Sequence, residues 1–133
     1  MPAAMWSDQF VTGIELIDAQ HKELFVCLNQ LFDAIKDNTS RQTLQESLAS
    51  LARRTIKHFQ TEESLMKEIG YPTRCAHSEL HNELILKVRA VQYEQAKGQA
   101  PSLEVARYLA GWFDHHIVDV DLGYVEYMKN MKS

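Results

Sequence analysis

The stretch His58-Phe59-Gln60-Thr61-Glu62-Glu63 places an imidazole and a carboxylate four residues apart, in a long run without glycine or proline. Four residues turn an α-helix by about 400°, so His58 and Glu62 point in nearly the same direction. That direction is apolar, because steps of three and four residues give the row Leu44, Leu48, Leu51, Thr55, His58, Glu62, Leu65 and Ile69. Burying two ionisable side chains without partners is costly. The stretch therefore predicts a buried group, such as a metal ion, that binds both.

Apolar periodicity predicts three further helices, each with histidine on its inward face. The first helix is expected to begin at Asp18 as N-cap and to end near residues 37–38, with the row His21, Leu24, Leu28, Leu31 and Ile35. The helix with the opening stretch spans residues 41–69, between a cap at Thr39 or Ser40 and a stop at Gly70. The third spans residues 73–97, with the row His77, His81, Leu84, Val88 and Val91. The fourth follows Ser102, with the row Val105, Leu109, Trp112 and His116.

The ends of the chain add two smaller elements. Residues 1–17 contain aromatics but no sustained period, which indicates an extended, non-helical arm packed through Trp6 and Phe10. Tyr124, Val125 and Met128 indicate a short terminal helix. The predicted fold is all-α, an antiparallel up-down-up-down four-helix bundle with an N-terminal arm and a short C-terminal helix, forming a single domain over residues 1–133.

Antiparallel packing would bring all the inward histidines to one end of the bundle. His21, His77 and His81 open their helices, whereas His58, Glu62 and His116 lie near helix ends. A lone buried histidine is more often a hydrogen-bonded core residue than a ligand, but a bundle interior offers too few partners for six such groups. We therefore predict a metal centre at this end.

The number and type of ligands narrow the choice of metal. Six or seven ligands exceed the four of a structural zinc site and imply two ions. Mixed imidazole and carboxylate donors favour iron over calcium or magnesium. Beyond His116, Asp119 continues the inward row of a regular helix, whereas Asp121 would require a break or a π-type bulge. The Glu-x-x-His pairs of ferritin-like di-iron bundles are absent from the sequence.

The composition excludes several other functions. Of the 133 residues, 45 % are hydrophobic and 24 % charged, and the net charge of −4 provides no basic surface for nucleic acid or anionic membrane. The first ten residues lack a basic segment followed by an apolar run, and no long apolar stretch predicts a membrane span, so we expect a cytoplasmic protein. Cys27 and Cys75 are far apart in sequence and are expected to be reduced thiols.

The histidine and carboxylate series resembles the hemerythrin family, specifically its single-domain bacterial members, over essentially the whole chain. The resemblance rests on His21, His58-x-x-x-Glu62, His77-x-x-x-His81 and His116-x-x-x-x-Asp121. It extends to Trp6, the Asp18-Ala19-Gln20-His21 start, Phe59, Met66 and Tyr124.

This resemblance implies two non-heme iron ions, bridged by an oxo or hydroxo group and by Glu62 and Asp121. One iron is then expected to bind His58, His77 and His81, and the other His21 and His116. A ligand at Asp121 implies that the fourth helix is broken or bulged after His116. We expect His115, Asp119 and Glu63 to be solvated, although Glu63 could orient a ligand from outside.

The implied function is reversible dioxygen binding for storage, transport or delivery, by a protein that is not an enzyme. Two six-coordinate ions offer about twelve positions, of which these ligands and one bridging oxygen fill about eleven, leaving one for dioxygen at the iron with two histidines. Its pocket walls, which equally suit an ordinary core, are expected to be Phe25, Phe59, Trp112, Phe113 and Ile117.

Other functions fit the same site. They are a di-iron oxidase or peroxidase, a nitric-oxide-handling enzyme and an O2 sensor module, although the predicted domain leaves no output segment for a sensor. Iron storage is disfavoured because a single closed site cannot mineralise iron. We expect a monomer, with a cytoplasmic oxygen-consuming enzyme or reductase as candidate partner.

Overall fold

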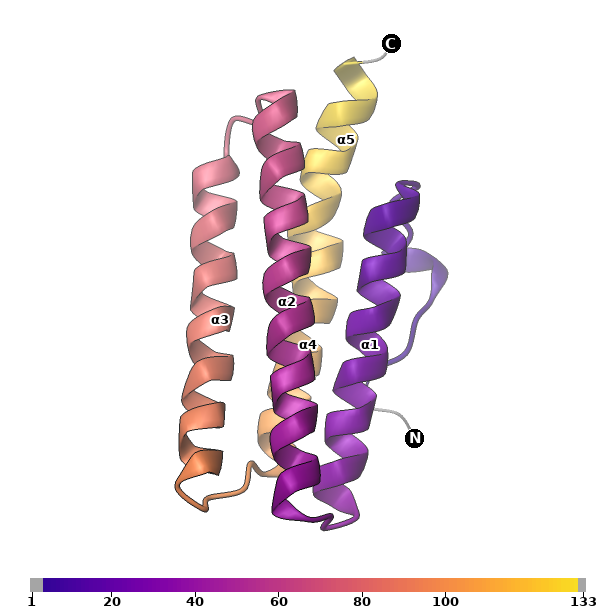
Figure 1. Cartoon of the computed structure of the whole chain (residues 1–133). Helices are drawn as coiled ribbons and strands as arrows, with labels where there is room; N and C mark the ends of the chain where they lie inside the picture. The colour runs from indigo at the N-terminus through magenta and orange to yellow at the C-terminus, as the bar shows by residue number, and fades with distance from the viewer. Residues whose placement is uncertain (1–3, 132–133) are drawn as a thin grey trace.

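The computed structural model describes residues 4–131, which fold into long helices running alternately up and down (Figure 1). The bundle helices are α1 (Glu15–Lys36), α2 (Arg41–Ile69), α3 (Arg74–Ala96) and α4 (Leu103–His116). Helix α1 packs against α2 and α4, and α2 also packs against α3. The predicted all-α four-helix bundle is confirmed. Residues 1–3 of the predicted arm and residues 132–133 lie outside the described range.

Local sequence signals set three of the helix ends. The Ser40 hydroxyl accepts a hydrogen bond from the Thr43 N–H at 3.1 Å, and the Ser102 hydroxyl accepts one from the Val105 N–H at 3.3 Å. Gly70 ends α2 in the left-handed conformation, with φ of 68°, which glycine adopts without steric cost. The predicted limits of α2 are confirmed, and those of α3 hold to within one residue.

The predicted start of α1 is wrong by three residues. The helix begins at Glu15, so Asp18 lies inside its first turn instead of preceding it. From there the Asp18 carboxylate accepts hydrogen bonds from the Thr12 N–H at 2.9 Å, the Thr12 hydroxyl at 2.8 Å and the Gly13 N–H at 3.2 Å. Asp18 therefore stabilises the turn before the helix without being its N-cap.

The N-terminal arm packs onto the bundle through its aromatic side chains. Phe10 is 2 % exposed, and its ring centroid lies 5.1 Å from that of Phe25 on α1. Trp6 lies 5.8 Å from the same ring. The predicted packing is confirmed, but the arm is not free of helix, because Asp8–Phe10 forms a 3₁₀ turn.

A π-helical segment follows α4 and leads into the terminal helix. It spans Ile117–Asp121, and α5 (Leu122–Met131) continues from it, at the yellow end of the chain in Figure 1. In π-helical geometry the hydrogen bonds join residues five apart, so Asp121 returns to the face that carries His116. The predicted bulge and the short terminal helix are both confirmed.

Much of the apolar core lies away from the histidines. Leucines from three helices are at most 1 % exposed there, namely Leu28, Leu31, Leu48, Leu51 and Leu109. Among the described residues no helix has the length and hydropathy needed to span a membrane. The two cysteines are free thiols, with Cys27 buried and Cys75 exposed.

Candidate metal centre

All seven ligand positions predicted from the sequence come together at one end of the bundle. Each is at most 3 % exposed. They are His21 on α1, His58 and Glu62 on α2, His77 and His81 on α3, His116 on α4, and Asp121 at the end of the π-helical segment. Their ligand atoms form two groups, each within a span of 4.8 Å.

The first group contains three histidines, which we call the three-histidine group. The Nε2 atom of His116 lies 3.0 Å from Nε2 of His77 and 3.1 Å from Nε2 of His81. Asp121 Oδ1 is 2.8 Å from His77 Nε2 and 3.0 Å from His116 Nε2, and Glu62 Oε1 is 3.4 Å from His81 Nε2. His77, His81 and His116 therefore point their distal nitrogens at one small volume.

The second group, which we call the two-histidine group, contains His21 and His58, whose ring centroids are 4.5 Å apart. Its carboxylates are again Glu62 and Asp121. His58 Nε2 lies 3.1 Å from Glu62 Oε1, and His21 Nε2 lies 3.3 Å from Asp121 Oδ2. Both carboxylates thus belong to both groups, as expected of bridging ligands.

The division of the histidines differs from the prediction, which grouped His58 with His77 and His81 and left His116 with His21. In the structure His116 joins His77 and His81, and His58 joins His21. The reason is the position of α2, which packs against both α1 and α3. His58 lies on the α1 side of this helix, whereas Glu62, one turn later, reaches toward both groups.

The buried polar atoms fit a metal better than they fit one another. Seven side-chain atoms of these ligands have no hydrogen-bond partner within residues 4–131, including His21 Nε2, Glu62 Oε1 and both oxygens of Asp121. Asp121 Oδ1 is only 2.8 Å from His77 Nε2, yet the pair lacks hydrogen-bond geometry. Buried polar atoms are rarely left unpaired in native proteins. Cations in the centre would satisfy the five of these atoms that face it, namely His21 Nε2, His58 Nε2, Glu62 Oε1 and both oxygens of Asp121.

Electrostatics keep the two carboxylates ionised, as metal ligation requires. Burial raises the pKa of Glu62 and so does Asp121, but the charge and close contact of His58 and the close contact of His81 outweigh both, and the pKa falls to about 2. Burial also opposes ionisation of Asp121, yet contacts with His116, His21 and His77 hold its pKa well below the usual value. Burial lowers the pKa of His116, which favours the neutral imidazole that binds metal.

Two side chains outside the ligand set fix the tautomers of two histidines. His81 Nδ1 donates to Glu63 Oε2 at 3.0 Å, and His58 Nδ1 donates to Gln20 Oε1 at 2.7 Å. The direction follows from the partners, because a carboxylate or amide oxygen only accepts. Each Nε2 therefore presents a lone pair to the centre. Glu63 was expected to be solvated but able to orient a ligand from outside, and both hold, since its side chain is 37 % exposed and contacts His81.

Tyr124 holds one of the shared carboxylates. Its hydroxyl donates to Glu62 Oε2 at 2.6 Å from a fully buried position in α5. Burial and the charges of Glu62 and Asp121 raise the pKa of this phenol, so it stays protonated. Sequence reasoning assigned no role to Tyr124 or Gln20. The available signals were their place beside ligands, three residues after Asp121 and immediately before His21, and their part in the family resemblance.

Aromatic side chains cover the three-histidine group. Phe59 stacks face to face on His81 with ring centroids 3.7 Å apart, and Trp112 stacks on His116 at 4.4 Å. Phe113 packs against both aromatic rings and is 1 % exposed. Of the other predicted pocket residues, Ile117 is buried and Phe25 packs against Trp6 and Phe10.

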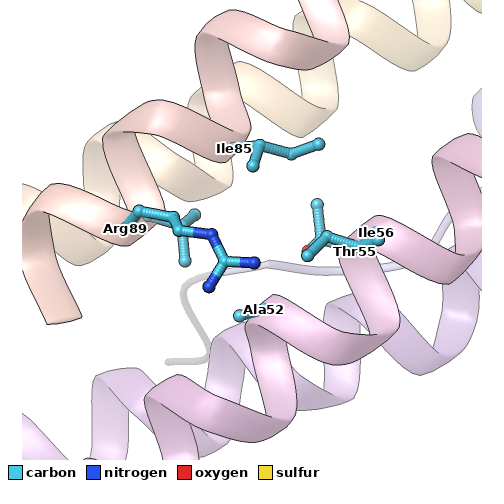
Figure 2. Close-up of a pocket in the computed structure, with 6 residues that line it drawn as sticks. Ala52, Thr55, Ile56, Ile85 and Arg89 are labelled. Atoms are coloured by element: carbon cyan, nitrogen blue, oxygen red, sulfur yellow. The ribbon is translucent and has the colours of Figure 1, made fainter.

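A small, partly open apolar cavity lies one helical turn further into the bundle, between α2 and α3. It is too narrow to admit a water molecule. Figure 2 shows Thr55 and Ala52 on α2 facing Ile85 on α3, with the side chain of Arg89 reaching across toward α2. Thr55 precedes His58 by one turn and Ile85 follows His81 by one turn, so the cavity adjoins the centre.

His115 and Asp119 lie outside the centre, as predicted. Their side chains are 73 % and 57 % exposed, and they pair with each other at 2.7 Å. Neither faces the buried histidines, and Asp121 is therefore the aspartate that joins the ligand groups.

The fold and the site together define a helical-bundle protein with a buried histidine and carboxylate centre for cations. A family model described as the hemerythrin HHE cation binding domain matches residues 12–127. The chain belongs to the hemerythrin family, whose members bind non-heme iron.

Individual relatives agree with this assignment over nearly the whole chain. A bacteriohemerythrin of Pseudomonas aeruginosa is 32 % identical over 133 residues, covering 100 % of this chain and 86 % of the relative. A myohemerythrin of Sipunculus nudus is 30 % identical over 120 residues, covering 90 % and 89 %. A crystal structure of wild-type hemerythrin aligns with a TM-score of 0.86 at 28 % identity, covering 92 % of this chain and 95 % of the other.

Proposed function

We propose that this protein binds dioxygen reversibly at two non-heme iron ions, for oxygen storage, transport or delivery, and is not an enzyme. The observation that carries the proposal is the presence of Glu62 and Asp121 in both buried ligand groups. Two cations held side by side need ligands that can bind both of them. Five imidazoles with two carboxylates suit iron, and the similarity to bacteriohemerythrin and myohemerythrin supports the same metal.

In this proposal the ligands divide as the two groups do. His77, His81 and His116 hold one ion, His21 and His58 hold the other, and Glu62 and Asp121 bridge them together with an oxo or hydroxo group. When bound, a pair of ferrous ions would supply the electrons that reversible dioxygen binding needs. The two-histidine group has one imidazole fewer, so the open position for dioxygen falls there.

The surrounding side chains keep water and protons away from this position. Every proposed ligand is at most 3 % exposed, and the Tyr124 proton is held in its hydrogen bond to Glu62. Phe59, whose ring lies 6.0 Å from that of His58, and Phe25, one turn after His21, are the proposed walls on the two-histidine side. A dry, apolar pocket limits loss of a bound ligand to side reactions. This supports a carrier over an oxidase.

Metal analysis with the visible spectrum before and after oxygenation tests the proposal. We expect about two iron ions per chain and an absorption band that appears with dioxygen and disappears under vacuum. One zinc ion per chain, or no metal, would end the proposal. Rapid oxygen consumption with an added reductant would favour a di-iron oxidase instead.

The remaining parts of the proposal concern the setting of the protein. We propose a cytoplasmic monomer that exchanges dioxygen with an oxygen-consuming enzyme or is kept reduced by a reductase. Sedimentation of the iron-loaded protein tests the oligomeric state, and a stable dimer would contradict it.

A further inference from the structure

The two ligand groups differ in the side chains that support them from outside. In the three-histidine group, Glu63 accepts a hydrogen bond from His81 Nδ1 at 3.0 Å. In the two-histidine group, Gln20 accepts the corresponding bond from His58 Nδ1 at 2.7 Å. One acceptor is a carboxylate and the other a neutral amide.

Both acceptors are themselves held in place. The other oxygen of Glu63 accepts a hydrogen bond from the Ser78 hydroxyl at 2.6 Å. Ser78 lies on α3, about one turn before His81. The amide nitrogen of Gln20 donates to the Thr61 hydroxyl at 3.2 Å, which fixes the amide oxygen toward His58. The contrast between carboxylate and amide is therefore built into the structure by two anchored side chains.

A carboxylate acts more strongly than an amide on the imidazole that donates to it. Hydrogen bonds to ionised acceptors are about twice as strong as neutral ones. By drawing the Nδ1 proton toward itself, the carboxylate raises the basicity of the opposite ring nitrogen, which is the metal ligand. Glu63 should therefore make His81 Nε2 a stronger donor than Gln20 makes His58 Nε2.

We propose that Glu63 is a positioning residue that fixes the His81 ring and strengthens it as a donor, so that the three-histidine and two-histidine positions are electronically unequal. This inference rests on the proposed iron centre. The higher-charged, ferric state gains most from the stronger donor. The pairing of Glu63 with His81 therefore lowers the reduction potential of the centre, and Gln20 leaves the dioxygen-binding side without that effect.

Glu63→Gln is the direct test, because it removes the charge and keeps the size of the side chain. The Glu63 side chain is 37 % exposed and borders a surface depression lined by Arg74, Cys75 and Ser78, so the variant should fold. The matched control is Glu68→Gln, which removes the same charge from an exposed position on the same helix.

Two measurements on the iron-loaded proteins separate positioning from general stability. For Glu63→Gln we expect metal affinity, by chelator competition, to fall about 10- to 100-fold. Its midpoint potential, by spectroelectrochemical titration, should rise by about 59 mV, a tenfold change for one electron. Glu68→Gln should change neither, and Gln20→Glu should lower the potential. Equal shifts in Glu63→Gln and Glu68→Gln, or a fall in Glu63→Gln, would overturn the inference.

A measurement without metal distinguishes this inference from the proposed function. In ¹⁵N NMR of the metal-free protein, His81 should show a single tautomer with the proton on Nδ1. Glu63→Ala should lose that preference. If the wild-type protein binds no iron, the proposed function fails, while the tautomer result still decides whether Glu63 positions His81. An unchanged His81 signal in Glu63→Ala would contradict the inference in either case.

Discussion

Glu62 is the residue on which both ligand groups depend. It reaches His58 and His81 with one oxygen, at 3.1 Å and 3.4 Å, and accepts the Tyr124 hydroxyl with the other. Glu62→Ala should therefore lose at least one iron. The control is His115→Ala, which removes an exposed imidazole and should keep both ions. Metal content by elemental analysis checks both variants, and the reverse outcome would mean that the inward face of the helices is wrongly assigned.

Tyr124→Phe tests the support of the same carboxylate. The change removes one hydroxyl and leaves Glu62 Oε2 without its buried donor. Hydrogen bonds to charged groups contribute about 1.5–3 kcal/mol, so the free energy of unfolding of the metal-free protein should fall by about that amount. Urea denaturation measures it. Tyr108→Phe, at a tyrosine that is 54 % exposed, should stay within about 0.5 kcal/mol of wild type.

At single positions the sequence predicted which residues would be inward but not how they would be shared. Helical periodicity identified six of the seven buried ligand candidates, because a histidine or glutamate in a row of leucines is conspicuous, whereas Asp121 followed from the family resemblance. It could not assign His58 and His116 to their groups, since that depends on the rotation and neighbours of each helix. Glu63 was recognised only as a residue that could orient a ligand, and the role of Gln20 was not predicted, because a polar residue within a helix is ordinary until its tertiary contact is known.

Helix α2 contains a buried hydroxyl that conflicts with its apolar surroundings. Thr55 lies in its core row and is 1 % exposed, yet its hydroxyl has no hydrogen-bond partner among the described residues. Thr55→Val replaces that hydroxyl with a methyl of similar size beside the apolar cavity. We expect the free energy of unfolding to rise by about 1 kcal/mol, as the cost of burying an unpaired hydroxyl is removed.

Thr61→Val provides the opposite case on the same helix. The Thr61 hydroxyl donates to the Lys57 carbonyl at 3.0 Å and accepts from Gln20. This variant should lose about 1 kcal/mol of stability. Urea denaturation of both variants checks the pair, and a loss in Thr55→Val would show that its hydroxyl is paired in solution.

The helix limits and the π-helical segment show how far local signals reach. Ser40, Gly70 and Ser102 set ends that were predictable because capping is a contact within a few residues. The choice of Asp121 over Asp119 followed from the family resemblance, since a regular helix favours Asp119. The start of α1 was missed because Asp18 hydrogen-bonds backward to Thr12 and Gly13 from inside the helix.

Across the whole molecule, much of the apolar core lies at a distance from the candidate metal centre. The side chains of Leu31, Leu51 and Leu109 are fully buried, and they pack away from the histidines. Most of the hydrophobic burial therefore does not depend on metal, and the metal-free protein should fold. The metal-free protein still contains a cluster of buried ionisable groups, and these groups make its stability sensitive to pH.

The metal-free protein should lose stability as the pH falls from neutral. The pKa of Glu62 is about 2 when folded against 4.5 for the free side chain, and that of Asp121 is likewise depressed. The stability that these two carboxylates contribute is fully present above their unfolded pKa values. It is lost as the pH falls through their folded pKa values. The pKa of His116 in the folded protein is also depressed, below 6.5. As the pH falls, the unfolded chain therefore takes up this proton before the folded protein does, which also lowers the free energy of unfolding.

Urea denaturation at a series of pH values measures this dependence. The free energy of unfolding should decline steadily from about pH 6.5, where His116 begins to matter, and more steeply below about pH 4.5, where the carboxylates add to it. Replacing Glu62 and Asp121 together by glutamine and asparagine should flatten the acidic part. The part due to His116 should remain and grow, because Asp121 raises the pKa of His116 and its replacement leaves the effect of burial less opposed. A wild-type curve that is level between neutral pH and about pH 4 would contradict the proposed balance of charges, because protonation of a buried, neutral His116 cannot be free of cost.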